Sequence, residues 1–525
     1  MLRLDLSAID YGIVAIYFLV VLGIGFVARL TIKTDLDFFL SGRSLPAWIT
    51  GLAFIAANLG ALEILGQAAN GAQYGVAAVH YYWIGAVPAM VFLGIVMMPF
   101  YYGAKVRSVP EYLRLRFGEA AHAFNAATFA IATVLISGVN LFALALIIHL
   151  MIGWSVTTAI LAAAAIVLIY ITLGGLTSAI YNEVLQFFII CASLIPLTIV
   201  ALHSVGGVDG LKDKVRNFKP LGEPGLHAWQ GVGIHHVTNP LASDWVGIVF
   251  GLGFVLSFGY WTTNFAEVQR ALSARNMSAA RRTPLIGAYP KIFLPAIIIL
   301  PGLIATVSVK GLGGESLSLQ YNTAIPHLIG NFLPEGMLGI AVTGLLAAFM
   351  AGVAANVTSF NTVVTYDLIQ AYFRKDRDPQ YYLRMGRIVT IVGILISVGT
   401  AFIAKGYSNI MNYIQTLFSI FNAPLFATFI IAMFWRRATP WGGFWSLVAG
   451  TAAAYGVNRM DAYDYVFSFD SALSASFWQA IIAFLACAVV LVVVSLFTQP
   501  KPAEELRGLV WGLKREPDPD VREDP

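Results

Sequence analysis

Long apolar stretches recur along almost the whole chain, separated by short polar segments. A helix needs roughly 20 mainly apolar residues to cross a bilayer core of about 30 Å. About thirteen stretches reach that length, so the pattern predicts about thirteen membrane-spanning helices and an all-α polytopic membrane protein. Their predicted limits are 11–30, 47–66, 77–102, 121–147, 154–173, 182–202, 246–266, 284–308, 336–366, 384–404, 409–435, 441–457 and 474–497.

The composition agrees with this pattern and excludes several other classes. Of the 525 residues, 58% are hydrophobic and 11% are charged, whereas soluble domains average roughly 45–50% and about 25%. Two cysteines in apolar runs do not make a disulfide scaffold, and a net charge of +4 spread over loops is not a nucleic-acid footprint. The sequence also lacks a nucleophile elbow, a phosphate loop and a zinc motif. We therefore expect neither an enzyme nor a bound cofactor.

Basic residues concentrate in the loops that follow odd-numbered predicted spans. The seventh and ninth spans, for example, are followed by Arg270, Arg275, Arg281 and Arg282, and by Arg374, Lys375 and Arg377. The positive-inside rule then predicts an outer N-terminus and a cytoplasmic C-terminus. The first span has its positive charges after it and lacks a small-residue cleavage site, so we expect an uncleaved anchor in the plasma or inner membrane.

Two predicted spans carry polar and flexible residues near mid-depth. The second contains Asn58, Gly60 and the acid Glu63, and the seventh contains Ser257, Gly259, Thr262, Thr263 and Asn264. Interrupted helices at corresponding positions of two halves indicate an inverted-repeat transporter, because unwound backbone binds ions and solute. An acid at the centre of a span costs roughly 2.5–3.5 kcal/mol to insert, so Glu63 should face a cavity or a partner. In the simpler interpretation, glycine and asparagine only allow close helix packing.

Short motifs along the chain have the order and spacing of one transporter family. They include Ser41-Gly42-Arg43-Ser44-Leu45-Pro46, Ile55-Ala56-Ala57-Asn58, Val109-Pro110-Glu111-Tyr112, Gln269-Arg270-Ala271-Leu272, Tyr413-Ile414-Gln415 and Phe434-Trp435-Arg436-Arg437. From about residue 10 to about residue 450 the chain resembles the sodium/solute symporter family, and most closely its sugar and polyol branch of sodium/galactose and sodium/glucose transporters. The resemblance implies a leucine-transporter type fold with five-plus-five inverted repeats, flanking helices and alternating access around a central site.

On this resemblance the chain divides into six segments. They are an anchor helix with a cytoplasmic loop (1–46), a first five-helix repeat (47–202), an extracytoplasmic loop (203–245), a second inverted repeat (246–435), C-terminal helices (436–497) and a cytoplasmic tail (498–525).

The resemblance also implies positions for a sodium ion, as the coupling ion. In the family, sodium is held by backbone carbonyls at the break of the second span and by one carbonyl and two hydroxyls on the ninth. The carbonyl positions match Ala56, Leu59 and Ala348, and the hydroxyl positions fall on Ala351 and Gly352. Because these two residues have no side-chain oxygen, we expect an altered sodium site. In the alternative interpretation, which uses the residues alone, the small residues of the ninth span form a seam that lets two helices pack closely.

Solute contacts are implied at residues of the second, third, seventh, eighth and eleventh spans. The matching residues are Glu63, Tyr82, Gly85, Ser257, Lys291 and Gln415, with Tyr81, Tyr260 and Trp261 as aromatic surfaces. Lys291 and Gln415 keep the polar types of the family, whereas Glu63 replaces an amide. Rings stack on the apolar faces of sugars while polar groups bind their hydroxyls, although a zwitterion would also fit between Glu63 and Lys291. Alternatively, Lys291 pairs with Glu63 only to make burial tolerable.

The sequence therefore predicts a secondary active transporter of a small polar solute, a sugar or polyol above all. The family favours sodium symport. Proton symport through Glu63 and uncoupled transport stay open, as does a non-transporting membrane sensor that uses the same pocket. The lipid bilayer, the solute and sodium or a proton are the expected partners, and the sequence leaves the identity of the solute and the oligomeric state open.

Overall fold

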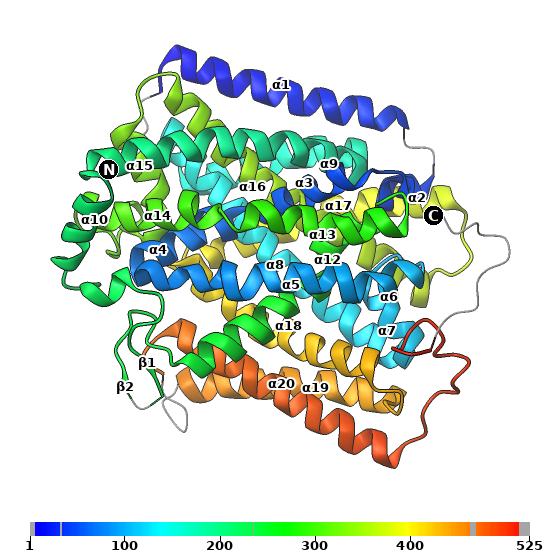
Figure 1. Ribbon diagram of the computed structural model, residues 1–525. Helices are drawn as coiled ribbons and strands as arrows, with labels where there is room; N and C mark the ends of the chain where they lie inside the picture. Colours follow the sequence, from blue (N-terminus) through cyan, green and yellow to red (C-terminus); the bar gives the residue numbers. More distant parts are fainter. Residues whose placement is uncertain (1–5, 32–33, 235, 463–468, 514–525) are drawn as a thin grey trace.

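The computed structural model describes residues 6–31, 34–234, 236–462 and 469–513. Parts of the predicted segments 1–46 and 498–525 therefore lie outside the described residues. Long helices run roughly parallel to one another through the molecule, with α1 along one side and α19 and α20 along the opposite side (Figure 1). Short helices and a small hairpin close the two ends of this bundle.

The helices and strands have the following limits. The long elements are α1 (Ala8–Thr31), η4, α5, η5 and α6 (Tyr81–Ala86, Val87–Phe92, Leu93–Met97 and Met98–Gly103), α8 (Glu119–Ile152), α9 (Val156–Ser204), α13 (Met277–Lys291), α14 (Leu294–Ser308), α16 (Met337–Thr362), η10 (Val363–Phe373), α17 (Pro379–Ala404), α18 (Ile410–Phe434), α19 (Pro440–Ala462) and α20 (Ala472–Phe497). Two interrupted helices consist of α3 (Ala47–Asn58), η2 (Leu62–Gln67), α4 (Ala68–Tyr74) and η3 (Gly75–Val79), and of η7 (Gly247–Ser257), α11 (Phe258–Thr263) and α12 (Phe265–Leu272). The remaining elements are α2 (Asp35–Leu40), η1 (Ser41–Arg43), α7 (Val109–Phe117), α10 (Gly207–Arg216), η6 (Glu223–Leu226), β1 (Val232–Gly233), β2 (His236–Val237), η8 (Leu317–Leu319), η9 (Tyr321–Thr323) and α15 (Ala324–Phe332). β1 and β2 pair antiparallel, with Val232 opposite Val237.

The described helices include candidates for eleven of the thirteen predicted spans. Nine are long and apolar enough to cross a membrane, and counting each of the two bent pairs as one span raises the number to eleven. The predicted spans 154–173 and 441–457 are also helical, but they form the first part of α9 and the helix α19, which are not among these eleven. The predicted all-α polytopic architecture is confirmed.

The predicted spans 154–173 and 182–202 are continuous in one helix, α9, which kinks at Gly175. The kink places this residue at φ 52° and ψ −148°, a region that residues with a Cβ rarely adopt. A Cβ at this position would also lie 2.7 Å from the carbonyl oxygen of Phe38. Glycine therefore allows both the kink and the close approach of α2 to α9.

Both mid-depth interruptions lie where the sequence predicts them. The second span leaves the helical conformation at Leu59 (ψ 38°) and bends by 56° between α3 and the helix that starts at Leu62. The seventh span breaks at Asn264 (ψ 111°) and bends by 48°. The side chain of Asn264 accepts a hydrogen bond from the N–H of Ala266 at 3.0 Å and so caps the new helix α12.

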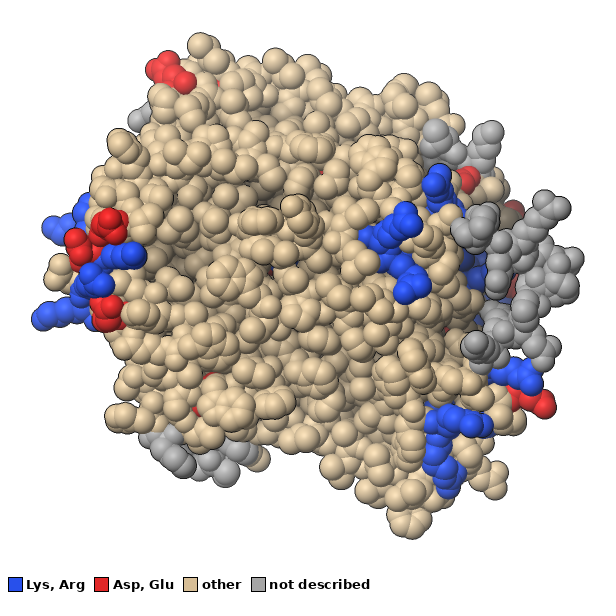
Figure 2. All heavy atoms as spheres, viewed as in Figure 1, with Lys and Arg blue, Asp and Glu red and all other residues tan. Residues whose placement is uncertain are grey.

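The surface has the charge distribution of a protein embedded in lipid. On the face shown in Figure 2, charged side chains gather at the two ends of the bundle and the middle band is almost free of them. The end near α2, α6 and α7 shows mostly Lys and Arg, whereas the end near α10 shows both signs. Large apolar side chains are exposed on the outer helices, for example Leu19 of α1, Leu395 of α17 and Val489 of α20. These side chains form a band that lipid can cover.

The interior of the bundle consists of α8 and α16, together with the interrupted helices. The most apolar windows of α8 and α16 are 89% buried, against 28% for those of α1 and α20. The two breaks therefore lie inside the bundle, where neighbouring helices can satisfy their free backbone groups.

Candidate solute and ion site

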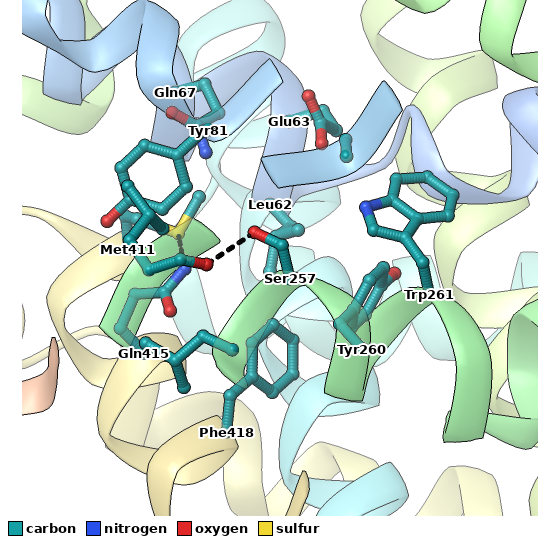
Figure 3. A pocket seen from close by; sticks show the side chains of 13 residues that line it. Leu62, Glu63, Gln67, Tyr81, Ser257, Tyr260, Trp261, Met411, Gln415 and Phe418 are labelled. Carbon is teal, nitrogen blue, oxygen red and sulfur yellow. Dashed lines mark hydrogen bonds between the residues drawn. The ribbon is translucent and has the colours of Figure 1, made fainter. Parts of the chain in front are cut away.

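A small cavity lies beside the two helix breaks. It is bounded by η2, by η7 with α11, and by α18, whose side chains point toward one another across it (Figure 3). The lining residues are Leu62, Glu63, Gln67, Tyr81, Ala86, Leu252, Leu256, Ser257, Tyr260, Trp261, Met411, Gln415 and Phe418. The space that the centre of a water-sized sphere can reach inside it is about 30 Å³, which leaves it smaller than a sugar requires. A solute of several carbon atoms therefore enters only after the surrounding helices move apart.

Glu63 is the centre of a buried ion pair. The Nζ of Lys291 in α13 donates to Oε1 of Glu63 at 2.6 Å, and the hydroxyl of Tyr82 donates to Oε2 at 2.6 Å. The ammonium also lies 4.8 Å from the ring centre of Tyr82 and 4.9 Å from that of Trp261. Each carboxylate oxygen thus has a donor, and the two rings stabilise the cation further.

A second chain of hydrogen bonds leads away from Lys291. Its Nζ donates to Oδ1 of Asn58 at 2.5 Å, and Nδ2 of Asn58 donates to the hydroxyl of Tyr260 at 3.0 Å. The hydroxyl of Tyr260 in turn donates to Oε1 of Glu267 at 2.6 Å. Asn58 is the last residue of α3, so its amide links the break of the second span to α11 and α12.

The structure brings together all nine residues that the resemblance indicates for the solute site. Glu63, Tyr81, Ser257, Tyr260, Trp261 and Gln415 line the cavity. Tyr82 and Lys291 lie behind Glu63 and contact its carboxylate instead. Gly85 packs against the side chain of Ser257, because a Cβ there would lie 2.3 Å from the Ser257 hydroxyl.

The side chains of Gln415 and Ser257 differ in how many of their polar atoms are hydrogen-bonded to other residues. The Oε1 of Gln415 has no hydrogen-bond partner among the described residues, and its Nε2 makes a 3.4 Å contact with the sulfur of Met411. The hydroxyl of Ser257 donates to the carbonyl of Leu252 at 2.8 Å. Tyr81 also lines the cavity, and its hydroxyl likewise has no hydrogen-bond partner among the described residues, so Gln415 and Tyr81 are the lining residues with unused polar capacity.

The residues predicted for sodium also lie near one another. Ala56 and Leu59 flank the end of α3, and Ala348, Ala351 and Gly352 are buried in α16. A Cβ at Gly60 would lie 3.2 Å from the Cα of Gly352, so the break and α16 are in close contact.

An amide from α8 fills the space between the break and α16. The Oδ1 of Asn140 accepts a hydrogen bond from the N–H of Ala61 at 2.8 Å, and its Nδ2 donates to the carbonyl of Ile136 at 3.2 Å. A Cβ would lie 2.4 Å from this Oδ1 if added at Gly60, and 2.1 Å if added at Gly352. Asn140 thus caps the break, and it leaves no room for a side chain at one of the two expected hydroxyl positions.

A second buried ion pair joins α12 to α9. Arg270 donates through Nε and one terminal nitrogen to the two oxygens of Glu183 in α9, and both side chains are buried. Glu183 is fully buried and is therefore not a solvated acid at the membrane boundary. Its charge is compensated by Arg270.

Two residues of this region were not predicted from the sequence. Glu267 is one residue beyond the predicted end of the seventh span at 266, and it becomes buried because the chain turns at Asn264 and continues as α12. Asn140 is on the fourth predicted span, and its role depends on contacts with residues 79 positions away along the chain. For Asn140 the available signal was a polar side chain within an apolar span, and for Glu267 an acid directly after one.

A separate polar cavity of about 190 Å³ lies between α7 and η10, lined by Arg107, Glu111, Arg114, Tyr366, Asp367, Gln370, Ala371, Lys375 and Asp376. Burial raises the pKa of Glu111, although the N–H of Arg107 donates to its carboxylate at 2.5 Å. Within the described ranges, no group of three or more His, Cys, Asp or Glu side chains has the arrangement of a metal site.

Comparison with solved structures identifies the fold. The chain superposes on a substrate-bound, outward-open Na⁺-coupled sialic acid symporter with a TM-score of 0.78 and 17% identity, covering 94% of this chain and 99% of that one. It also superposes on Mhp1, a nucleobase-cation-symport-1 family transporter, with a TM-score of 0.53 and 15% identity over 91% of this chain and 99% of that one. These likenesses confirm the predicted leucine-transporter type fold.

Sequence relatives and a family model agree with each other. Sodium/glucose cotransporter 1 of Sus scrofa is 30% identical, over 97% of this chain and 82% of its own length. Sodium/glucose cotransporter 4 of Homo sapiens is 29% identical, over 98% and 80%. The model of the sodium:solute symporter family matches residues 38–450, which include both helix breaks and the cavity between them. The chain therefore belongs to the sodium:solute symporter family of membrane transporters.

Proposed function

We propose that this protein is a secondary active transporter that moves an uncharged polar solute, a sugar or polyol, in symport with a cation. The observation that carries the proposal is the cavity between the two helix breaks, where Gln415 presents an unpaired acceptor beside the rings of Trp261, Tyr260 and Phe418. Aromatic faces with a few polar groups suit the apolar faces and the hydroxyls of a sugar.

The charges around the cavity favour an uncharged solute over a zwitterion. Glu63 and Lys291 already satisfy each other at 2.6 Å. Tyr82 also donates to Glu63, and the ring of Trp261 lies against the ammonium of Lys291. A zwitterion would have to separate this buried pair, whereas a sugar can bind to Gln415 and the rings without doing so. The relatives with the names of sodium/glucose cotransporters support the same solute class.

Family membership makes sodium the first cation to test. Any residue type can supply a backbone carbonyl, so Ala56, Leu59 and Ala348 retain these ligand atoms. Ala351 and Gly352, in contrast, contribute no hydroxyl. We therefore propose that any sodium at this site is held by fewer protein oxygens than the family pattern provides.

We further propose that residues 47–202 and 246–435 form the two inverted repeats, joined by an extracytoplasmic loop at 203–245. Residues 1–46 and 436–497 are the flanking helical segments, and residues 498–525 are a cytoplasmic tail. The breaks at Leu59 and Asn264 lie at corresponding places in the two repeats, which supports this division. The Lys- and Arg-rich end near α2, α6 and α7 supports a cytoplasmic location for that end in the plasma or inner membrane (Figure 2). This orientation gives an outer N-terminus and a cytoplasmic C-terminus.

The test is uptake by the purified protein in proteoliposomes. A radiolabelled panel of D-glucose, D-galactose, sorbitol and glycine is offered under an imposed sodium gradient, and separately under an imposed pH gradient. We expect accumulation of at least one sugar or polyol above equilibrium. Binding of a sugar without any uptake would instead indicate a sensor, and selective uptake of glycine would contradict the solute class.

A further inference from the structure

The buried charges near the two breaks do not balance. Glu63, Glu183 and Glu267 are three acids, and Lys291 and Arg270 are two bases, all at most 5% exposed. Arg270 is engaged by both oxygens of Glu183, and Lys291 is in direct contact with Glu63. Glu267 is therefore the acid without a cation of its own in this cluster.

Glu267 is also incompletely hydrogen-bonded. Its Oε1 accepts from Tyr260, but Oε2 has no partner among the described residues although the side chain is only 2% exposed. An ionised carboxylate with an unpaired oxygen is costly in a buried site. A bound proton removes the charge and turns the unpaired oxygen into a hydroxyl group.

From this geometry we infer that Glu267 is a proton-binding site and that its proton crosses the membrane together with the solute. The inference rests on the proposed function and specifies its coupling cation. The proton adds to one carboxylate oxygen of Glu267 as the site is loaded, and the resulting carboxylic acid gives it up to water when the opposite side opens.

Hydrogen bonds connect this proton site to the solute cavity. The donors run in one direction, from Lys291 to Asn58, from Asn58 to Tyr260, and from Tyr260 to Glu267. Tyr260 lines the cavity, so a solute that contacts its ring also acts on the group that holds Glu267. Solute binding and protonation are thereby linked through one side chain.

Glu267 is better suited to bind a proton than to bind a sodium ion. Sodium needs several oxygen atoms at once, and the expected sodium positions have lost two hydroxyls at Ala351 and Gly352. A proton needs only one oxygen, which Glu267 offers. The protein has therefore lost sodium ligands near the first break and carries a buried acid near the second.

Among the described residues, four other ionisable side chains act on Glu267. Tyr260 of α11, Lys291 of α13, Arg270 of α12 itself and Glu183 of α9 are the ones that act on it. α3 and α16, which also pack against α12, contain no ionisable side chain. In α2, Asp37 caps its own helix, and in α6 the hydroxyls of Tyr101 and Tyr102 donate to backbone carbonyls.

The transport test uses D-glucose in proteoliposomes without sodium, with the membrane potential held at zero by valinomycin and equal potassium. A gradient of about one pH unit, acid outside, supports about tenfold accumulation at one proton per uncharged solute. We expect wild type to approach this value and to acidify an internal pyranine solution as glucose enters. Glu267→Gln keeps an acceptor for Tyr260 but cannot bind the proton, so accumulation and glucose-linked acidification should be lost. Exchange of preloaded glucose should continue. Glu111→Gln is the matched control, because Glu111 does not belong to the series of hydrogen bonds from Lys291 to Glu267. This variant should keep glucose-linked acidification.

Infrared spectroscopy tests the proton without any solute. Wild type near neutral pH should show a carboxylic acid C=O band that is lost in Glu267→Gln and kept in Glu63→Gln. Glucose uptake without proton movement would overturn the inference while leaving the proposed function standing. Wild type that takes up no panel solute would contradict the proposed function, and the infrared band alone would then decide the inference. An unchanged band in Glu267→Gln overturns it.

Discussion

The Nζ of Lys291 lies 2.6 Å from Oε1 of Glu63, and this buried contact joins α13 to the interrupted second span. Both side chains are nearly inaccessible, with 1% and 5% exposure. Removing one partner of a buried pair leaves the other charge uncompensated, which typically costs about 3–5 kcal/mol. Lys291→Met should therefore lower the thermal unfolding temperature of the detergent-solubilised protein markedly.

The double variant Glu63→Gln, Lys291→Met separates the charge effect from the loss of packing. With both charges removed, the double variant should recover much of the decrease in unfolding temperature caused by Lys291→Met. It should not recover solute uptake. If the double variant is no more stable than Lys291→Met alone, the unpaired carboxylate is not the cause of the destabilisation.

Gln415→Ala should weaken solute binding with little effect on stability, because Oε1 of Gln415 has no hydrogen-bond partner among the residues that the structure describes. A hydrogen bond to a solute that is worth about 1–2 kcal/mol corresponds to a factor of about 5–30 in apparent affinity. The apparent KM for the best panel solute should rise by this factor.

Gln479→Ala is the matched control for Gln415→Ala. Gln479 is buried in α20 and donates to the carbonyl of Ala454 at 2.7 Å, away from the cavity lining. Its loss should reduce stability but leave the apparent KM unchanged. An unchanged KM in Gln415→Ala would remove Gln415 from the solute site.

Restoring hydroxyls on α16 should have different results at the two positions. Ala351→Ser adds one oxygen beside the break and should increase the stimulation of uptake by sodium. Gly352→Ser alone should lower stability, because its Cβ would lie 2.1 Å from Oδ1 of Asn140. Adding Asn140→Ala to Gly352→Ser removes this clash but uncaps the N–H of Ala61. Uptake measured against sodium concentration checks each variant, and no sodium response in any of them would exclude these positions from the ion site.

The proposed orientation is tested by cysteine labelling in a Cys191→Ser background, which removes the half-buried native thiol. A cysteine at Lys375, in the loop after η10, should react with an impermeant maleimide only in inverted vesicles. A cysteine at Lys212 in α10 should react in intact cells, since its side chain is 51% exposed in the proposed outer loop. Labelling of both positions from the same side would contradict the topology.

Features encoded locally could be predicted from the sequence. Asn58 with Gly60 and the polar run ending at Asn264 marked the two breaks, because Gly and Asn form helices less readily than Ala or Leu and they recur here at corresponding places in two spans. The proximity of Glu63 to Lys291 followed from the family resemblance and from the cost of burying an acid. Glu267 could not be assigned in this way, since its burial depends on the 48° bend that directs α12 into the bundle. The capping of Ala61 by Asn140 likewise depends on tertiary packing that no local pattern specifies.

The small size of the cavity also determines what a binding measurement on this protein reports. The centre of a water-sized sphere reaches only about 30 Å³ of it, so a solute of several carbon atoms binds only the fraction of molecules in which the helices around Tyr260, Trp261 and Phe418 have separated. The apparent dissociation constant is then the intrinsic constant of the open form divided by that fraction. Substitutions that loosen the packing of α11 against α18, without touching the solute, should therefore tighten apparent binding. Affinity in this protein then depends on the closure as much as on the groups that contact the solute.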